Sequence, residues 1–350
     1  MNTRKLGWTD LHLTEIGIGA WAMGGEGTAF SWGPQDDAES IAAIKRGIEL
    51  GVNWIDTAAI YGLGHSEEVV GKAVDGIRDS VIIATKCSQV WNAERVVSHS
   101  LRKDSILAEC EASLKRLKTD RIDLYQIHWP GAEGSPIEEG WEVIIQLVEQ
   151  GKIRYGGVSN FTADHMARCV VAPASLPVGQ VSKPVFASEA KQSPARIASL
   201  QPPYSMLRRA VEVLQFPYCE EHQIGVVAYS PMQAGLLTGH FDIDKIAASD
   251  WRRRTPEFQQ PNLGINLALV EKLREVANGY GKSVAQLALA WTLRLPVMTS
   301  AIAGARRPSQ IEETVGGSGW EISPVDLETI EDLLAWRIEE VQNVGGYVRG

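Results

Sequence analysis

The chain has 350 residues, of which 44% are hydrophobic, and this is enough to build the core of a single α/β barrel. The formal net charge is −9 and the sequence pI is about 5.4, so the surface repels nucleic acids and anionic membranes, and we expect neither as a partner. The first residues hold no apolar run typical of a secretory signal, and no apolar run is long enough to cross a bilayer.

Four cysteines occur in the sequence, and no two of them form a CxxC pair. This pattern is typical of reduced, buried thiols, so we expect a cytoplasmic protein. The four are Cys87, Cys110, Cys169 and Cys219.

The first predicted element is a short β-hairpin made by the segments RKLGWTD and LHLTE, which we expect to cover one mouth of the fold. Apolar or β-branched runs then alternate with segments of helical period. In one such segment Ile41, Ile44 and Ile48 mark the buried face, and Asp36 and Gly51 suit the two ends. The eight strand-like runs are 16–21, 52–57, 81–86, 122–129, 153–160, 197–201, 225–230 and 297–304.

Eight strands alternating with helices indicate a parallel sheet closed into a (β/α)8 TIM barrel, with residues 1–350 as one domain. An open, doubly wound sheet is the competing architecture, and it usually carries a glycine fingerprint at its first turn. Residues 17–22, GIGAWA, fit that fingerprint. The following MGGEGTAFSWGP cannot form the helix whose N-terminus would meet a pyrophosphate, so we interpret the small residues as a strand exit.

Two connections are long. Residues 172–196 are rich in Pro, Ser and Ala, and we interpret them as a loop inserted between the fifth and sixth strands, near the mouth opposite the active face. Residues 238–264 follow a strand, which places them at the active face of a barrel. We interpret their arginine run, DWRRR, as a solvated surface.

Polar residues end three neighbouring strands in the predicted barrel. Asp56, Lys86 and His128 close the second, third and fourth strands. Adjacent strands lie about 4.8 Å apart, so these three strand ends lie within roughly 10 Å of one another. Tyr61 follows the second strand and can fold over the same place. A buried Asp and a buried Lys each need a partner, and these two can supply one another.

These four side chains suit addition to a carbonyl group. We expect Asp56 to keep Lys86 protonated, and the ammonium to lower the pKa of Tyr61, which then donates a proton to the carbonyl oxygen. His128 could orient the carbonyl or share the donor role. The set includes neither a serine or cysteine nucleophile nor a cluster of metal ligands, so we expect no metal.

The sequence resembles the aldo-keto reductases over nearly its whole length, from RKLGWTDLHLTEIGIGAW to GARRPSQIEE. The D-x4-Y motif of that family stands at Asp56 to Tyr61, its lysine in ATK (Lys86) and its histidine in YQIHW (His128). The resemblance implies hydride transfer from a nicotinamide cofactor, usually NADPH, bound in an extended form without a Rossmann fold.

The same resemblance implies the cofactor contacts. Ser159, Asn160 and Gln201 would hold the carboxamide, and Tyr229 would stack on the nicotinamide ring. Arg306 and Arg307 offer charge for a 2′-phosphate, which favours NADP over NAD. Ala20, Trp21 and Asp56 would also face the cofactor; the pyrophosphate segment would supply Ser230, Met232, Gln233, Gly235 and Leu236, and the adenosine segment Gly304, Gln310 and Glu313. Thr314 departs from the asparagine common in the family.

The substrate would be a small-molecule carbonyl compound held by aromatic walls. We expect those walls at Trp21, Trp32, Trp91 and Trp129, and we place Trp54 and Trp141 in the core. The sequence carries no signal for an oligomeric state.

Two alternatives to a cytoplasmic NADPH-dependent aldehyde or ketone reductase stay open. The family includes cofactor-bound regulatory subunits of potassium channels, although this sequence has no obvious long docking tail. A Schiff-base aldolase using Lys86 is the other, and it needs a neutral lysine, which a neighbouring Asp56 disfavours.

Overall fold

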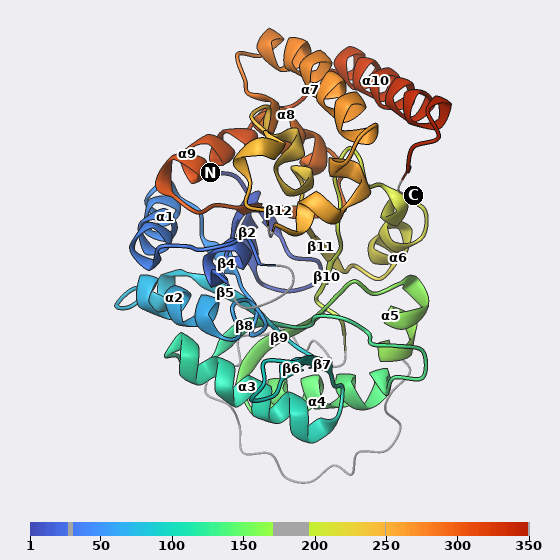
Figure 1. The fold of residues 1–350 in the computed structure, drawn as a ribbon. Coiled ribbons are helices and arrows are strands. Elements are labelled where there is room, and N and C mark those ends of the chain that lie inside the picture. Colours follow the sequence, from blue (N-terminus) through green and yellow to red (C-terminus); the bar gives the residue numbers. More distant parts are fainter. Residues whose placement is uncertain (27–30, 171–195, 249, 349–350) are drawn as a thin grey trace.

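The computed structural model describes residues 1–26, 31–170, 196–248 and 250–348. Parallel strands close into a barrel in the order β10-β11-β12-β3-β4-β5-β8-β9 (Figure 1). The predicted barrel is confirmed, and each of the eight runs holds a strand. The strands are β3 (Ile16–Gly19), β4 (Trp54–Asp56), β5 (Ile82–Cys87), β8 (Ile122–Ile127), β9 (Ile153–Ser159), β10 (Ser199–Gln201), β11 (Gly225–Tyr229) and β12 (Met298–Gly304).

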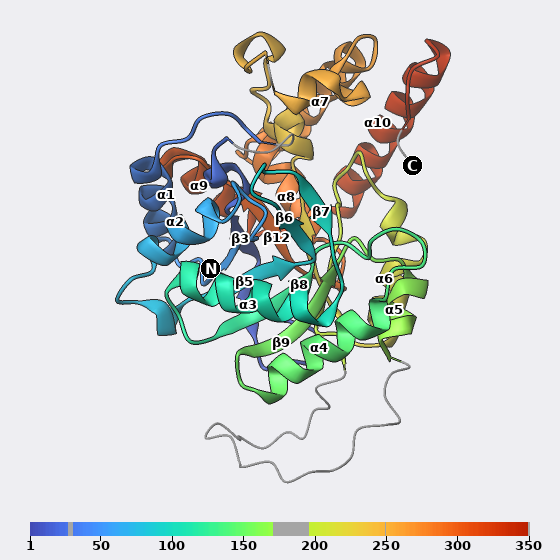
Figure 2. The same cartoon turned by 60° about the horizontal axis from the view of Figure 1, so that its bottom comes forward.

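Helices surround the barrel, and two further helices, α7 and α10, pack against each other and project beyond it (Figure 2). The first helix begins where its sequence predicts, because the Asp36 side chain accepts hydrogen bonds from the N–H groups of Ala38 and Glu39. The helices are α1 (Asp37–Glu49), α2 (His65–Ala73), α3 (Lys103–Leu117), α4 (Ile137–Glu149), α5 (Ala163–Val170), α6 (Gln215–Glu221), α7 (Asn262–Gly279), α8 (Val284–Leu293), α9 (Pro308–Thr314) and α10 (Pro324–Asn343).

The predicted N-terminal hairpin is present and closes the barrel at the amino ends of its strands. Strand β1 (Thr3–Lys5) pairs antiparallel with β2 (His12–Thr14). The connecting side chains Leu6, Trp8 and Leu11 are buried in one cluster with Trp54, which points into the barrel. The hairpin is therefore a plug, and the opposite mouth is the one left for a ligand.

The glycines near residue 17 serve packing. A Cβ on Gly17 would lie 2.1 Å from the indole of Trp54, and one on Gly19 would lie 2.8 Å from Ile302. Strand β3 ends at Gly19, earlier than the predicted 21, and the short 3-10 helix η1 (Trp21–Gly24) follows. In the described residues that follow β3, up to residue 26, no α-helix begins, which agrees with the strand-exit interpretation and not with a dinucleotide fingerprint.

The two long connections differ in what the structure shows. Of the predicted insertion 172–196, all but Arg196 lies outside the described residues. The connection 238–264 leaves β11 at the active face, as predicted, and it forms short 3-10 turns, among them η5 (Ile243–Lys245), η6 (Trp251–Arg254) and η7 (Pro256–Phe258), before α7 begins.

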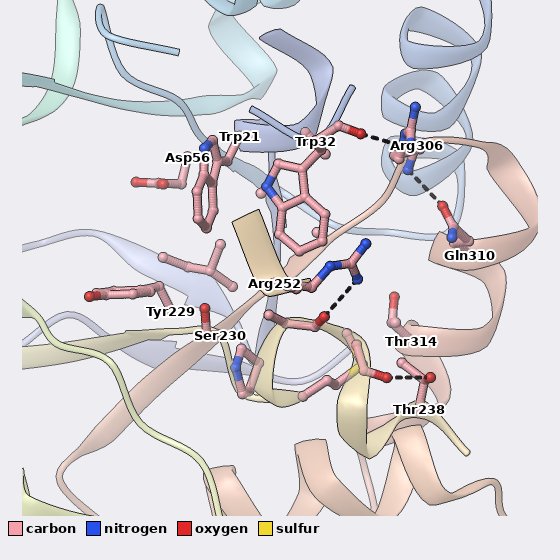
Figure 3. A pocket seen from close by; sticks show the side chains of 18 of the residues that line it. Trp21, Trp32, Asp56, Tyr229, Ser230, Thr238, Arg252, Arg306, Gln310 and Thr314 are labelled. Carbon is pink, nitrogen blue, oxygen red and sulfur yellow. Dashed lines mark hydrogen bonds between the residues drawn. The ribbon is translucent and has the colours of Figure 1, made fainter. Parts of the chain in front are cut away.

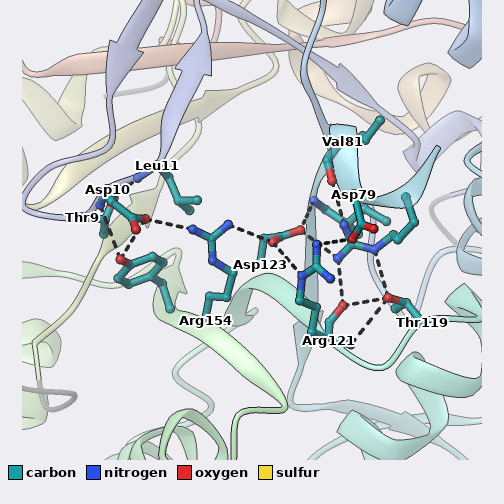
Figure 4. Close-up of polar contacts among 12 residues, drawn as sticks. Thr9, Asp10, Leu11, Asp79, Val81, Thr119, Arg121, Asp123 and Arg154 are labelled. Carbon is teal, nitrogen blue, oxygen red and sulfur yellow. Dashed lines mark hydrogen bonds and ion pairs between the residues drawn. The ribbon is translucent and has the colours of Figure 1, made fainter. Parts of the chain in front are cut away.

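An ion network ties strand β8 to its surroundings at the closed mouth (Figure 4). Asp123 is 2% exposed, and it accepts hydrogen bonds from Arg78 at 2.8 Å, Arg154 at 3.2 Å and the N–H of Ile83 at 3.0 Å. The arginines and the N–H group offset the cost of burying this carboxylate, so Asp123 can hold the starts of β5, β8 and β9 together.

The four cysteines are buried and unpaired. Among the described residues, no helix combines the length and the hydropathy needed to cross a membrane.

Candidate active site

The carboxyl ends of the strands surround a cavity of about 1090 Å³. Figure 3 shows Asp56 and Tyr229 toward one end of it, and Arg306, Gln310 and Thr314 toward the other. The two ends therefore differ in chemistry: the first carries groups that can exchange a proton, and the second carries guanidinium and amide groups.

The four polar residues predicted at the strand ends meet at the first end. Lys86 Nζ lies 2.7 Å from Asp56 Oδ2 and 3.3 Å from Tyr61 Oη. The rings of Tyr61 and His128 meet edge to face with their centroids 5.8 Å apart. Asp56, Tyr61 and His128 line the cavity, whereas Lys86 is buried behind them.

The ammonium of Lys86 has an acceptor for each of its three protons. It donates to Asp56 Oδ2, to the carbonyl oxygen of Thr57 at 2.9 Å and to Tyr61 Oη. Because Oη accepts from Lys86, the O–H of Tyr61 has to point elsewhere, and the cavity is the side open to it. Burial lowers the pKa of Lys86, and the charge of Asp56 opposes that shift.

The expected acidity of Tyr61 needs correction. Burial, followed by the negative charge of Asp56, raises the pKa of Tyr61 well above its ordinary value. The prediction that Lys86 lowers this pKa is wrong here, because desolvation of the phenolate outweighs the nearby ammonium. Tyr61 is consequently neutral, and its proton is available, throughout the physiological pH range.

The loop that carries Tyr61 is fixed by short contacts. The carbonyl oxygen of Tyr61 accepts a hydrogen bond from the N–H of Ser66, and the Ser66 hydroxyl donates in turn to the carbonyl oxygen of Ala20 at 2.8 Å. Gly62 has φ +63, and a Cβ there would lie 2.1 Å from the carbonyl oxygen of Gly24. Any larger residue at position 62 would displace the phenol.

His128 lies beside the phenol as a neutral ring. Burial, followed by the charge of Lys86, lowers the pKa of His128 well below its ordinary value. A neutral imidazole has one N–H, so His128 can donate a hydrogen bond to an oxygen held next to Tyr61.

The residues predicted to hold a carboxamide form one linked group. Gln201 Nε2 donates to Asp56 Oδ1 at 2.8 Å, and Tyr229 Oη donates to Asn160 Oδ1 at 2.9 Å. Gln201, Asn160 and Tyr229 line the cavity, but Ser159 does not, since its hydroxyl donates to the carbonyl of Gln201.

The segment after β11 presents backbone to the cavity in an unusual conformation. Ser230, Gln233 and Ala234 have positive φ angles, and Ser230, Met232 and Gly235 line the cavity. The Gln233 and Leu236 side chains do not line it: Gln233 accepts a hydrogen bond from Ser205, and Leu236 is 0% exposed. Ala20 is also 0% exposed and does not line the cavity, whereas its neighbours Gly19 and Trp21 do.

The two predicted arginines differ in their freedom. Arg306 is tied to the loop before α1, because it donates to Gln35 Oε1 at 2.6 Å and to the carbonyl oxygens of Trp32 and Pro34. Arg307 is exposed, and in the described part of the chain its guanidinium has no hydrogen-bond partner. The rest of this end also lines the cavity, with Gly304, Gln310, Glu313 and Thr314.

Arg252 is a cavity residue that the sequence interpretation missed. Its guanidinium pairs with Asp250 at 2.7 Å, donates to the carbonyl of Ala234 at 3.0 Å and lies 4.5 Å from the Trp32 ring centroid. The DWRRR run is therefore not simply a solvated surface. Its place in the connection after β11 was the available signal, because that connection was already predicted at the active face.

Three of the four tryptophans predicted as cavity walls line the cavity, namely Trp21, Trp32 and Trp129. Trp91 does not; its ring lies 5.9 Å from the guanidinium of Arg116 on α3. The hairpin that carries Trp91, β6 (Gln89–Trp91) and β7 (Val97–His99), presents Gln89 and Val97 to the cavity instead.

The chain matches the sequence model of the Aldo/keto reductase family over residues 15–335. The aldo-keto reductase YhdN of Bacillus subtilis is 37% identical over 330 residues, which are 93% of this chain and 91% of that protein. The NADH-specific methylglyoxal reductase of Escherichia coli is 32% identical over 345 residues, which are 95% and 98% of the two chains.

Solved structures agree with the sequence comparisons. A glycerol dehydrogenase from Gluconobacter oxydans superposes with a TM-score of 0.82 at 34% identity, and 96% of each chain is covered. An aldo-keto reductase from Klebsiella pneumoniae in complex with NADPH gives a TM-score of 0.70 at 27% identity, with 95% of each chain covered.

Proposed function

Because the chain belongs to the aldo/keto reductase family, we propose that it catalyses the reversible NADP(H)-dependent reduction of aldehydes and ketones, with Tyr61 as general acid. One observation carries the proposal: a single cavity joins a phenol backed by an ammonium at one end to an exposed guanidinium, Arg307, at the other. The phenol can transfer a proton to the substrate, and the guanidinium can bind an anionic cofactor.

The residues present fit a nicotinamide cofactor. Tyr229 offers a ring face beside the amides of Asn160 and Gln201, and Arg307 offers a charge without a described partner for a phosphate. The backbone of Ser230–Gly235, with its positive φ angles, can turn N–H groups toward an anion. When bound, NADPH supplies the hydride.

The protein's own contribution is to place and move one proton. His128 donates a hydrogen bond to the carbonyl oxygen and orients it, and Tyr61 transfers its proton to that oxygen as negative charge develops there. An alkoxide is a stronger base than a phenolate, so the transfer is favourable even though the pKa of Tyr61 is raised. Lys86 then stabilises the phenolate left behind through its hydrogen bond to Oη.

The same geometry disfavours a Schiff-base mechanism at Lys86. All three protons of its ammonium are engaged, one of them with the carboxylate of Asp56, so no lone pair faces the cavity. A regulatory subunit would need to bind the cofactor without catalysing a reaction. The cluster of Asp56, Tyr61, Lys86 and His128 favours catalysis instead.

We further propose small, oxygen-rich carbonyl compounds as the substrate class. Gln89 lines the cavity, and no described residue hydrogen-bonds its side-chain amide, which is therefore free to contact a second oxygen of the substrate. Two similar proteins are named for small, oxygen-rich molecules: a glycerol dehydrogenase, named for an alcohol, and a methylglyoxal reductase, named for a carbonyl compound.

A panel of carbonyl compounds tests the proposal directly. Glyceraldehyde, methylglyoxal, butanal and benzaldehyde are each mixed with the enzyme and NADPH, and consumption of the reduced nicotinamide is followed by its absorbance. We expect oxidation of NADPH, fastest with the two compounds that carry a second oxygen. Tight NADPH binding without oxidation by any carbonyl compound would contradict catalysis and favour a regulatory role.

A further inference from the structure

Ser88 joins three chain segments at the rim of the cavity. It follows β5 directly and has φ +81, a left-handed conformation that serine rarely adopts. Its hydroxyl lies within hydrogen-bond distance of both the carbonyl oxygen and the N–H of Trp129, at 3.2 and 3.3 Å, and its carbonyl accepts from the N–H of Ser100. The exits of β5 and β8 and the end of the β6–β7 hairpin are thus tied at one residue.

The N–H of Ser88 is held by a carboxylate on α3. Glu109 Oε2 accepts it at 2.8 Å, and the other oxygen of Glu109 accepts from the hydroxyl of Ser105 at 3.0 Å. Glu109 is 9% exposed, and among the described residues none forms an ion pair with it. A buried carboxylate without a cation is unfavourable for stability. A glutamine could contact both serines, because its oxygen can accept from the Ser88 N–H and its amide NH2 can donate to the hydroxyl oxygen of Ser105. Stability alone therefore does not explain a glutamate here.

The surroundings of Glu109 favour its neutral form. Burial is the largest influence and raises its pKa to about 7, and the hydrogen bonds from Ser105 and Ser88 oppose that shift. The charged and titratable groups that face it are Arg116 on α3, Glu67 on α2, the thiol of Cys87 on β5 and the phenol of Tyr125 on β8.

The residues tied at Ser88 belong to the substrate side of the cavity. Gln89 and Val97 of the hairpin line it, as do His128 and Trp129 at the exit of β8. His99 Nε2 also lies 2.8 Å from the carbonyl oxygen of Trp129, which links the hairpin to that exit a second time. A shift of the Ser88 backbone would consequently move both a polar and an aromatic part of the wall.

We propose that Glu109 is a positioning residue for the carbonyl substrate: its carboxylate holds the left-handed Ser88, and through Ser88 it fixes the cavity wall formed by Gln89, Val97 and Trp129. The inference rests on the proposed reductase function. Glu109 does not touch the cavity, so its effect falls on substrate binding and not on the cofactor. A charge-assisted hydrogen bond is about twice as strong as a neutral one, and protonation of Glu109 therefore loosens the wall.

Steady-state kinetics across pH test this role. In the wild type we expect the KM for a reduced carbonyl compound to fall as pH rises through about 7, with kcat and NADPH affinity changing little. Glu109→Gln should abolish that inflection and keep the KM at its low-pH value. Glu109→Met, which lacks any acceptor, should raise the KM roughly tenfold, the loss of one such hydrogen bond.

Two further variants separate positioning from simple destabilisation. Ser88→Gly keeps the positive φ but removes the bridge to Trp129, so it should raise the KM as well. Glu111→Gln, on an exposed face of the same helix, is the matched control and should leave the KM and its pH profile unchanged.

Amide hydrogen exchange tests the role of Glu109 without a substrate. Amide hydrogen exchange of residues 88–99, compared at about pH 8, where Glu109 of the wild type is mostly ionised, should be faster in Glu109→Gln and Glu109→Met than in the wild type and in Glu111→Gln. If both Glu109 variants show the KM values and exchange rates of the wild type, Glu109 is not a positioning residue. If the enzyme reduces no carbonyl compound but exchange is still faster in both variants, only the proposed function is contradicted.

Discussion

At the scale of single residues, the sequence alone predicts which side chains meet and predicts their electrostatics less well. The spacing of Asp56, Tyr61, Lys86 and His128 at successive strand ends leads to the cluster that the structure shows. The raised pKa of Tyr61 was not predictable, because it depends on how completely the surrounding side chains exclude water.

The raised pKa of Tyr61 makes a prediction about reaction direction. Reduction uses the neutral phenol, so its kcat should stay flat from about pH 6 to pH 9, where the group remains protonated. Oxidation of the alcohol needs the phenolate as base, and its rate should rise with pH across that whole range. Initial rates in both directions measure this; a reduction rate that falls through neutral pH would argue against Tyr61 as the acid.

Arg307 should discriminate between the two nicotinamide cofactors. The guanidinium of Arg306 is bound to Gln35 and to backbone carbonyls, which leaves Arg307 for a 2′-phosphate. We expect Arg307→Ala to weaken NADPH binding by about 1–2 kcal/mol and NADH binding very little. Fluorescence titrations measure both affinities, with Lys103→Ala on α3 as a control of equal charge change. An equal loss for both cofactors would show that Arg307 does not contact that phosphate.

At the scale of elements, alternation along the chain predicts the barrel strands, whereas the details of loops depend on contacts across the fold. The runs around Ile55 and Ile83 are recognisable as strands because they are apolar and bounded by turns. Trp91 was placed on the cavity because it follows a strand, but the β6–β7 hairpin turns it toward Arg116. Nothing in the local sequence fixes which residues of a hairpin face inward.

Glu109 on helix α3 makes the stability of the folded chain depend on pH. The folded pKa is about 7 against an ordinary 4.5, so between those values the folded chain keeps a proton that the unfolded chain has lost. Stability from this group is therefore complete below pH 4.5 and falls by about 3 kcal/mol as pH rises through 7.

Glu109→Gln removes the group whose titration makes the stability fall with pH. The free energy of unfolding of this variant, relative to the wild type, should increase between about pH 5 and pH 8. Urea unfolding at a series of pH values measures the difference. Two parallel stability curves would mean that Glu109 is ionised in the folded protein throughout.

At the scale of the whole molecule, the hairpin and the barrel form one packed unit with an open end and a closed end. The sequence predicts both, because the first 15 residues alternate like strands and eight further strands suffice to close a barrel. What it does not show is how deeply the plug is buried: Trp8 is 7% exposed, its indole N–H donates to the carbonyl of Ile197 at 2.7 Å, and its ring meets that of Tyr155.

Removal of the plug's largest side chain should affect stability without reaching the cavity. We expect Trp8→Ala to lower the free energy of unfolding by about 3–5 kcal/mol, while Val325→Ala, at a residue 70% exposed, changes it by less than about 0.5 kcal/mol. Urea unfolding monitored by circular dichroism compares the two. A loss at Trp8 no larger than that at Val325 would show that the hairpin is not part of the cooperative fold.

The central claim is that Tyr61 gives its proton to the carbonyl oxygen in a cavity that binds the cofactor independently of that phenol. The most direct measurement is Tyr61→Phe, assayed for carbonyl reduction and, by fluorescence titration, for NADPH affinity. Our account predicts that reduction falls by about 10²- to 10⁴-fold, the contribution of a general acid, while NADPH affinity stays close to that of the wild type. Near wild-type reduction by Tyr61→Phe would contradict it.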